Sequence, residues 1–276
     1  MRLRSLRLTP ERLADCEPLW GDRSFCTADE FASTQHMAKA LLASRRARGT
    51  IVIDEEGRPR FFGLTIFARS HAVDHALDHA APRLGASLLH GPHRDGVLDL
   101  EDIGRGNASG GLDLVVCAQG YAMNGADDDD WGVLLGALLQ QFHDVHRGFR
   151  LRRVVGQVFG TEGADIVVRS GAYPDVRLTR SVDRRGDDVV SALFGLTHEQ
   201  AIAGCSALLP MFTYFPPRVF FTEPEQAVLR EALDGATDVQ IAARLGLGLA
   251  AVKARLTRVR TDAGTAARDP APASHT

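Results

Sequence analysis

The spacing of apolar residues predicts alternating strands and helices over the first two thirds of the chain. Residues 2–8 alternate polar and apolar side chains, as a half-buried strand does. Residues 112–118 are a continuous apolar run, which is typical of a strand buried on both faces. Turn signals and spacing predict the other elements: a helix after Thr9, a helix at 27–47, a hairpin at 50–68, a partly helical insertion at 70–107, helices at 131–143 and 162–170, and strands at 151–159 and 176–182. This order predicts a mixed α/β domain.

The stretch 186–220 is predicted to connect this domain to the last part of the chain. Asp187–Phe194 and Thr197–Leu209 are expected to be short helices, the second of them starting at a capping box formed by Thr197 and Gln200. Aromatic side chains are dense in this stretch. They indicate that the connector packs against one of the domains.

The last part of the chain has the apolar spacing of three short helices. Thr222 begins the first with a capping box, and Thr237 is the N-cap of the second, which stops at Gly246. The third begins near Leu249 and buries a stripe made of Val252, Leu256 and Val259. A turn of this length between the last two helices predicts the steep crossing of a helix-turn-helix.

The charge of this part differs from that of the whole chain. Between Val239 and Arg260 there are five basic residues and no acidic one, although the formal net charge of the chain is −3. Such a local excess is expected where a helix enters a groove lined by phosphates. Two alternatives remain, a solvated basic face and a surface that binds protein.

Three segments carry a resemblance to a known family: Phe221-Thr-Glu-Pro-Glu-Gln-Ala-Val-Leu, then Gln240-Ile-Ala-Ala-Arg-Leu-Gly-Leu, then Ala251-Val-Lys-Ala-Arg-Leu. Together they resemble the DNA-binding domain of LuxR-type regulators. The family usually has Ser-x-x-Thr-Val-Lys-x-His where this chain reads Gly248-Leu-Ala-Ala-Val-Lys-Ala-Arg. The resemblance implies binding to double-stranded DNA through Thr237, Lys253, Ala254, Arg255, Thr257, Arg258 and Arg260.

No fourth helix is evident after this segment. Residues 263–276 are rich in Pro and Ala and are predicted to be a disordered tail. The fourth helix often makes the dimer contact in LuxR-type regulators. We therefore expect a homodimer to form through the N-terminal domain.

The element order of the first 182 residues, with Val168-Arg-Ser-Gly-Ala-Tyr173 near its end, resembles the acyltransferase fold of the GNAT superfamily. The resemblance implies that acetyl-CoA binds at the turn between the strand at Leu112 and the helix at Trp131. This turn contains four consecutive aspartates, Asp127 to Asp130, which would repel a pyrophosphate. Gln119 and Gly125 do not have the spacing of the family's phosphate-binding loop. We therefore expect no cofactor, and a domain that senses an unknown small-molecule or protein effector or mediates dimerisation.

Composition limits the choice of class and compartment. A chain of 276 residues, 45% hydrophobic and 24% charged, has room for one large domain and a small one. It has no apolar run of about 18 residues and no signal-peptide pattern, so we expect a cytoplasmic protein without a membrane partner. The cysteines Cys16, Cys26, Cys117 and Cys205 lie far apart, which favours free and mostly buried thiols.

Histidines are the remaining candidates for chemistry. His71, His75 and His79 repeat every four residues, so that neighbours share a helix face and could bind a transition metal. The alternative is an exposed polar face, and we expect no metal. His143 and His146 lie near the end of a long helix and are interpreted as structural. The chain has no G-x-S-x-G elbow, so a hydrolase is not supported.

The sequence thus predicts a DNA-binding transcription regulator. Its parts are a GNAT-like α/β domain at 1–185, a connector at 186–220, a small all-α LuxR-like helix-turn-helix domain at 221–262 and a tail at 263–276. No catalytic residue is assigned, and a non-enzymatic role is favoured. One alternative is an N-acetyltransferase that uses acetyl-CoA and carries a helical C-terminal appendage. Another is a protein-binding module.

Overall fold

The computed structural model of the chain describes residues 3–21, 23–78, 83–91, 93–122, 128–204, 206–214, 219 and 221–268; of residues 128–131 and 264–268 it describes the backbone alone. The chain divides into two units, Met1–Phe215 and Pro216–Thr276. Residues 186–214, predicted to be a connector, therefore belong to the first unit. None of the helices in the described ranges has the length and apolar character needed to cross a lipid bilayer.

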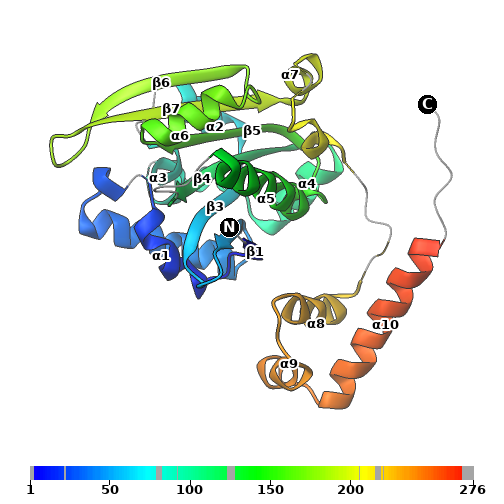
Figure 1. Cartoon of the computed structure of the whole chain (residues 1–276). Helices are drawn as coiled ribbons and strands as arrows, with labels where there is room; N and C mark the ends of the chain where they lie inside the picture. Colours follow the sequence, from blue (N-terminus) through cyan, green and yellow to red (C-terminus); the bar gives the residue numbers. More distant parts are fainter. Residues whose placement is uncertain are drawn as a thin grey trace. The chain divides into compact units, whose positions relative to one another are not determined.

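A mixed sheet forms the centre of the first unit (Figure 1). Among the described residues it has seven strands in the order β1-β2-β3-β4-β5-β7-β6. Neighbouring strands are antiparallel except β4 and β5, which are parallel. The strands are β1 (Arg4–Arg7), β2 (Ala47–Ile53), β3 (Pro59–Ala68), β4 (Leu112–Tyr121), β5 (Leu151–Phe159), β6 (Asp175–Val182) and β7 (Asp188–Thr197).

Helices cover both faces of the sheet. On β4, Val115 belongs to the core on one face, whereas Leu114 and Val116 belong to the core on the other, as the two-residue period of a strand requires. The first face is covered by η1 (Arg12–Leu19, a 3₁₀ helix), α1 (Ala28–Ala43), α2 (Ser70–Asp78) and α3 (Leu84–Leu89). The second face is covered by α4 (Leu100–Ala108), α5 (Asp128–His146), α6 (Thr161–Arg169), α7 (His198–Ala203) and the 3₁₀ helix η4 (Leu209–Phe212). The 3₁₀ helices η2 (Arg23–Phe25) and η3 (Arg94–Gly96) complete the first unit.

Local signals explain where several elements begin. The amide of Glu30 donates to Thr27 Oγ1 (3.1 Å) and the amide of Thr27 donates to Glu30 Oε2 (2.8 Å), which confirms the predicted capping box at the start of α1. The helix ends at Ala43, earlier than predicted, because Arg45 turns the backbone with a φ of 61° and Ala47 already begins β2. The predicted helix after Thr9 is the 3₁₀ helix η1.

One predicted element is wrong. Asp187–Phe194 was expected to be a helix, but Asp188–Thr197 is strand β7, which lies between β5 and β6. The stretch Val189-Val190-Ser-Ala-Leu-Phe suits a strand, and pairing with a neighbour on both edges overrides its weak local preference for a helix. The capping box of Thr197 and Gln200 is present and begins α7 directly after the strand.

The second unit contains α8 (Glu223–Leu233), α9 (Asp238–Leu245) and α10 (Leu249–Arg268). Val228, Ile241 and Val252, one from each helix, are fully buried and form its core. Gly246 ends α9 in the left-handed conformation, with a φ of 63°. Helix α10 continues over 263–268, where the disordered tail was predicted to begin. These residues are rich in Ala, and no proline precedes Pro270 to stop the helix.

Candidate active site

The parallel strands β4 and β5 pair over only part of their length. Their ladder extends along β4 from Leu112 to Val116, which lies opposite Gly156 of β5. Farther along, β4 stays paired with β3 as far as Tyr121, and β5 stays paired with β7 as far as Phe159. The carboxyl halves of two neighbouring strands therefore separate in the middle of the sheet. Backbone groups on their facing edges lie outside the ladder and need other partners.

Helices η1 and α3 cover one face of this opening. A Cβ atom on Gly120 of β4 would lie 1.5 Å from the carbonyl oxygen of Leu19, the last residue of η1. A Cβ atom on Gly85 of α3 would lie 1.6 Å from the carbonyl oxygen of Cys117 in β4. Only glycine permits such close approach of two backbones. Helices η1 and α3 therefore lie directly against β4 on this face.

Two glutamines hold the opening in place. Gln157 Oε1 accepts a hydrogen bond from the amide of Leu84 (2.8 Å), and its Nε2 donates to Ser191 Oγ (3.2 Å), so this side chain joins α3, β5 and β7. Gln119 Nε2 of β4 donates to the carbonyl oxygen of Gln157 at 3.3 Å. This bond crosses the gap between the two separated strands.

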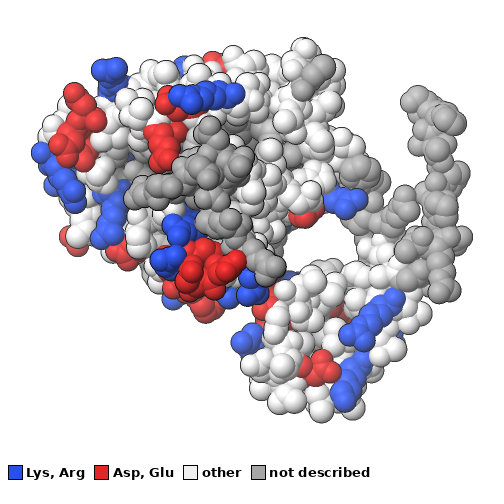
Figure 2. Space-filling view, viewed as in Figure 1, with Lys and Arg blue, Asp and Glu red and all other residues white. Residues whose placement is uncertain are grey.

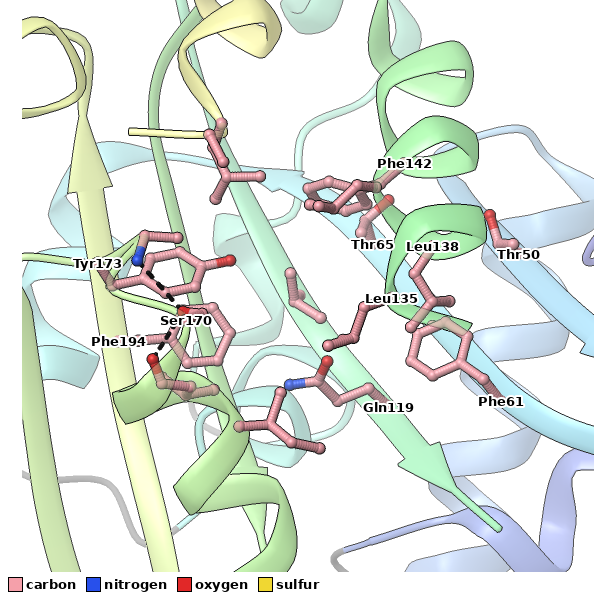
Figure 3. Close-up of a pocket in the computed structure, with 18 of the residues that line it drawn as sticks. Thr50, Phe61, Thr65, Gln119, Leu135, Leu138, Phe142, Ser170, Tyr173 and Phe194 are labelled. Atoms are coloured by element: carbon pink, nitrogen blue, oxygen red, sulfur yellow. Dashed lines mark hydrogen bonds between the residues drawn. The ribbon is translucent and has the colours of Figure 1, made fainter. Parts of the chain in front are cut away.

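The other face of the opening carries a cavity of about 340 Å³ between α5, α6 and the sheet (Figure 3). Helix α5 contributes side chains with the spacing of a single helix face, namely Leu135, Leu138, Leu139, Phe142 and His146. Helix α6 and the segments that follow contribute Ile166, Val167, Ser170, Ala172, Tyr173, Phe194, Ala207 and Leu208. Leu139 and Ala207 are also exposed, so the cavity opens to solvent beside them.

The floor of the cavity is hollow beneath α5. Phe61, Gly63 and Thr65 of β3 all line the cavity, at alternate positions along the strand. A Cβ atom on Gly63 would lie 3.0 Å from the ring of Phe61, so this glycine allows the ring to lie over the strand and border the cavity. We call the part of the cavity between α5 and strands β2 and β3 the α5 lobe, bounded by Thr50, Gly63, Thr65, Leu138, Phe142 and His146.

The polar groups of the cavity are largely satisfied within the protein. Ser170 Oγ donates to the carbonyl oxygen of Val167 (2.8 Å) and accepts from the amide of Ala172 (3.2 Å), a pair of bonds drawn in Figure 3. The hydroxyl of Tyr173 points into the cavity in the same view. Burial raises the pKa of Tyr173 above its ordinary value, so this phenol stays protonated at neutral pH.

His146 lies at the end of the α5 lobe and is 2% exposed. Its Nδ1 lies 2.7 Å from the carbonyl oxygen of Phe142 and its Nε2 lies 2.8 Å from Thr65 Oγ1. A carbonyl can only accept, so Nδ1 carries the proton of the neutral ring. Nε2 then accepts from Thr65, whose single hydroxyl hydrogen is shared with the carbonyl oxygen of Arg48 (3.2 Å). Burial lowers the pKa of His146 to about 3. The ring is therefore neutral, and it is not the cation at the helix end on which the structural interpretation of this residue was based.

The apolar character of α5 was visible in the sequence, but it was interpreted as ordinary core. A usable signal was Gly63 in the run Phe61-Phe62-Gly63-Leu64, because an isolated glycine inside a buried strand often marks a place where something approaches the backbone. The structure describes only part of the turn where the GNAT resemblance would place a cofactor. Gln119 lies in the cavity, whereas Gly125, Asp127 and the side chains of Asp128–Asp130 lie outside what the structure describes.

The predicted DNA-binding residues lie in the second unit, with Thr237 at the start of α9 and Lys253, Ala254, Arg255, Thr257, Arg258 and Arg260 on α10. The hydroxyl of Thr237 is bonded to Gln240 of its own capping box. Two basic side chains of the predicted surface lie beside carboxylates of α8: Arg244 pairs with Glu231 (2.9 Å) and Arg258 with Glu225 (3.4 Å). Six acidic and six basic residues lie between Thr222 and Asp262. On the face that Figure 2 shows, both signs of charge are present on this unit.

The predicted histidine cluster is not assembled as a metal site. His75 Nδ1 lies 3.1 Å from His93 Nε2, so His75 faces η3. His71, His75 and His93 line one surface depression, and His79 lies outside the described residues. Within the described ranges, no three His, Cys, Asp or Glu side chains are placed to hold a metal ion. Cys16, Cys26 and Cys117 are not part of a disulfide, and Cys205 is among the residues not described.

Comparison with known proteins gives matches among solved structures only. A Drosophila melanogaster polyamine N-acetyltransferase that forms N-acetylagmatine is 15% identical over 71% of this chain and 100% of that one, with a TM-score of 0.42. An agmatine N-acetyltransferase is 15% identical over 71% and 99%, with a TM-score of 0.43. A spermidine/spermine N-acetyltransferase from Vibrio cholerae is 9% identical over 73% and 95%, with a TM-score of 0.38. No protein-family model and no curated protein sequence matches the chain.

These comparisons contradict the predicted DNA-binding transcription regulator. The solved structures that match are N-acetyltransferases, and no family model supports a LuxR-type helix-turn-helix in the second unit. The physical reason for the error is that the run from Val239 to Arg260 was considered without α8. In the folded unit, carboxylates of α8 lie against two of its five basic residues.

Proposed function

We propose that the first unit is an N-acyltransferase that moves an acyl group from acyl-CoA to an amine. The observation that carries the proposal is the separation of β4 from β5 after Val116 and Gly156, directly beside the apolar cavity. Two parallel strands that part in the middle of a sheet offer unpaired edges to an extended ligand. The element order that resembles the GNAT superfamily is the reason for choosing acyl-CoA as that ligand.

The residues of the opening suit the pantetheine arm of CoA. This arm is an extended chain with two amides, and such a chain can add to an exposed strand edge through backbone hydrogen bonds. The edge of β4 beyond Val116 provides these groups, and Gln119 lies on it. Apolar side chains of α5 and α6 would cover the methylenes of the arm. The expectation that no cofactor binds was based on the charge of Asp127–Asp130 and on the spacing of Gln119 and Gly125, and both concern the pyrophosphate end of the cofactor.

Acyl-CoA would supply a thioester whose carbonyl carbon a neutral amine can attack. The new N–C bond replaces the C–S bond, the electron pair of that bond remains on sulfur, and the proton lost by the amine ends on the departing thiol. Tyr173 suits the donor role in this exchange, because its phenol points into the cavity and stays protonated. A base in the solvent takes the proton from the amine, and Tyr173 regains from the solvent the proton that it gives to the thiolate. The net result is the transfer of one proton from the amine to the thiol.

A free base is missing from the cavity as far as the structure describes its lining. No aspartate, glutamate or lysine lines it, and the lone pair of His146 Nε2 is taken by Thr65. The amine acceptor must therefore arrive in its neutral form. This distinguishes the site from one with a carboxylate that binds a cationic amine.

The test is a direct assay for acyl transfer. The full chain is incubated with acetyl-CoA or longer acyl-CoAs and a set of primary amines, and N-acylated products are detected by mass spectrometry. Mass detection avoids thiol reagents, which would also react with the cysteine thiols of the protein. CoA binding is measured in parallel by calorimetry. Failure of CoA and of every acyl-CoA to bind would refute the proposal.

A further inference from the structure

The α5 lobe lies to one side of the opening between β4 and β5. It extends across the sheet from β4 over β3 to β2, where Thr50 forms part of its floor. Two steps between neighbouring strands span about 9–10 Å. The pantetheine arm would follow the edge of β4, so it would not fill this lateral space.

The volume of the cavity is larger than a small acyl group requires. About 340 Å³ is roughly eleven times the ~30 Å³ that one water molecule occupies in the liquid. A methylene group is of similar size to a water molecule, and an acetyl group adds only two carbon atoms to the arm. Space therefore remains for a chain several methylenes longer.

The lining of the lobe shows which chemistry fits there. Leu138 and Phe142 cover it from α5, and Phe61 borders it on β3. Two of its polar atoms are engaged within the protein, because Thr65 Oγ1 and His146 Nε2 bond to each other. A polar ligand would therefore lose hydrogen bonds to water and gain few in return. An aliphatic chain has no hydrogen bonds to water to lose, and the transfer of its methylenes out of water is favourable.

The same lining argues against a polyamine in this space. An ammonium group in an apolar cavity needs a carboxylate or several acceptors beside it. None of the described residues that line the cavity is acidic. The aliphatic chain that fits the lobe therefore belongs to the acyl donor and not to the amine acceptor.

We infer that the α5 lobe binds the aliphatic chain of a medium-chain acyl-CoA, so that the acyl group transferred is octanoyl-like rather than acetyl. The inference rests on the proposed function, since the lobe adjoins the opening assigned to the pantetheine arm. Gly63 lies beneath the chain, and Leu138 and Phe142 enclose it. Thr50 and His146 mark the end of the lobe.

The experiment compares the affinities of CoA, acetyl-CoA and octanoyl-CoA for the full chain by calorimetry. Each buried methylene strengthens binding about fourfold, so we expect octanoyl-CoA to bind a hundredfold or more tightly than acetyl-CoA. The substitution Leu138→Trp fills the lobe from α5 and should abolish this preference for octanoyl-CoA over acetyl-CoA. Gly63→Ala fills less and should reduce the preference several-fold, which provides a second variant should Leu138→Trp not fold.

A matched control lies on the same helix. Val133 is 50% exposed and does not line the cavity, so Val133→Trp should keep the full preference for octanoyl-CoA. Equal affinities for acetyl-CoA and octanoyl-CoA in the wild-type protein would overturn the inference and leave the proposed function standing. An octanoyl preference that survives both lobe variants would overturn it as well. If neither CoA nor either ester binds, the proposed function fails and the inference fails with it.

Discussion

His146 makes the stability of the first unit depend on pH in a way that can be calculated. Its folded-state pKa is about 3, against 6.5 for an unperturbed histidine, and the cause is burial. Below pH 6.5 the unfolded chain binds a proton that the folded unit excludes. The free energy of unfolding therefore falls as the pH is lowered, over the window from about 6.5 to about 3. Above pH 6.5 the ring is neutral in both states and contributes no pH dependence.

The size of the effect follows from the width of this window. One pH unit corresponds to about 1.4 kcal/mol for a single proton. Between pH 7 and pH 4, His146 should lower the free energy of unfolding by roughly 3 kcal/mol. The variant His146→Gln lacks this proton site. It should be less stable than wild type at pH 7, because the bonds to Thr65 and Phe142 are changed, but it should lose roughly 3 kcal/mol less on acidification.

The assay is urea unfolding followed by tryptophan fluorescence at several values of pH. Trp20 and Trp131 are the two tryptophans of the chain, so the signal reports the first unit and not the second. Carboxylates that titrate in the same range affect both proteins equally and cancel in the comparison. His143→Gln on the same helix is the control for replacing a histidine by glutamine at a partly exposed position, because this side chain is 25% exposed. Identical pH dependence in wild type and His146→Gln would refute the reasoning.

Three further predictions concern catalysis and packing. Tyr173→Phe should lower kcat for acyl transfer about 10²-fold with little change in KM, measured by product formation; an unchanged kcat would exclude the proton-donor role. The value of kcat/KM should rise about tenfold per pH unit up to the pKa of the acceptor amine, because the described cavity lining has no free base; one common plateau for amines of different basicity would contradict this. Gly85→Ala should lower the free energy of unfolding by about 1–3 kcal/mol or more through its clash with Cys117, whereas Gly132→Ala on the open side of α5 should raise it by about 1 kcal/mol, both measured by urea unfolding.

Sequence patterns identified the elements whose signals are local. The predicted capping boxes at Thr27, Thr197 and Thr222 and the predicted N-cap at Thr237 are present, because each depends on residues close together in the chain. The buried run of β4 was predicted for the same kind of reason, since its neighbours cover it on both faces. Strand β7 was missed because its conformation is fixed by partners far away in the chain.

The candidate site could not be predicted because it forms where β4 and β5 stop pairing and where side chains do not fill the space beneath α5. The separation of β4 from β5 depends on close packing at Gly85 and Gly120, whose partners are distant in sequence. The cavity depends on Gly63 lying beneath α5, and the apolar face of α5 has the same pattern whether it covers a filled core or a hollow one. The basic run was assigned to DNA because charges on α8 could not be placed beside it from sequence alone.

The closure of one face of the sheet by η1 and α3 has a kinetic consequence. With Gly120 and Gly85 packed against neighbouring backbone, the described cavity lining is exposed at Leu139, Ser170 and Ala207. An entrance at this place would serve both partners of a transfer reaction. The molecule that reaches deepest must then enter first and leave last. The acyl donor would then bind before the amine, and the amide product would leave before CoA. The bound amine would block the exit of the donor during the reaction.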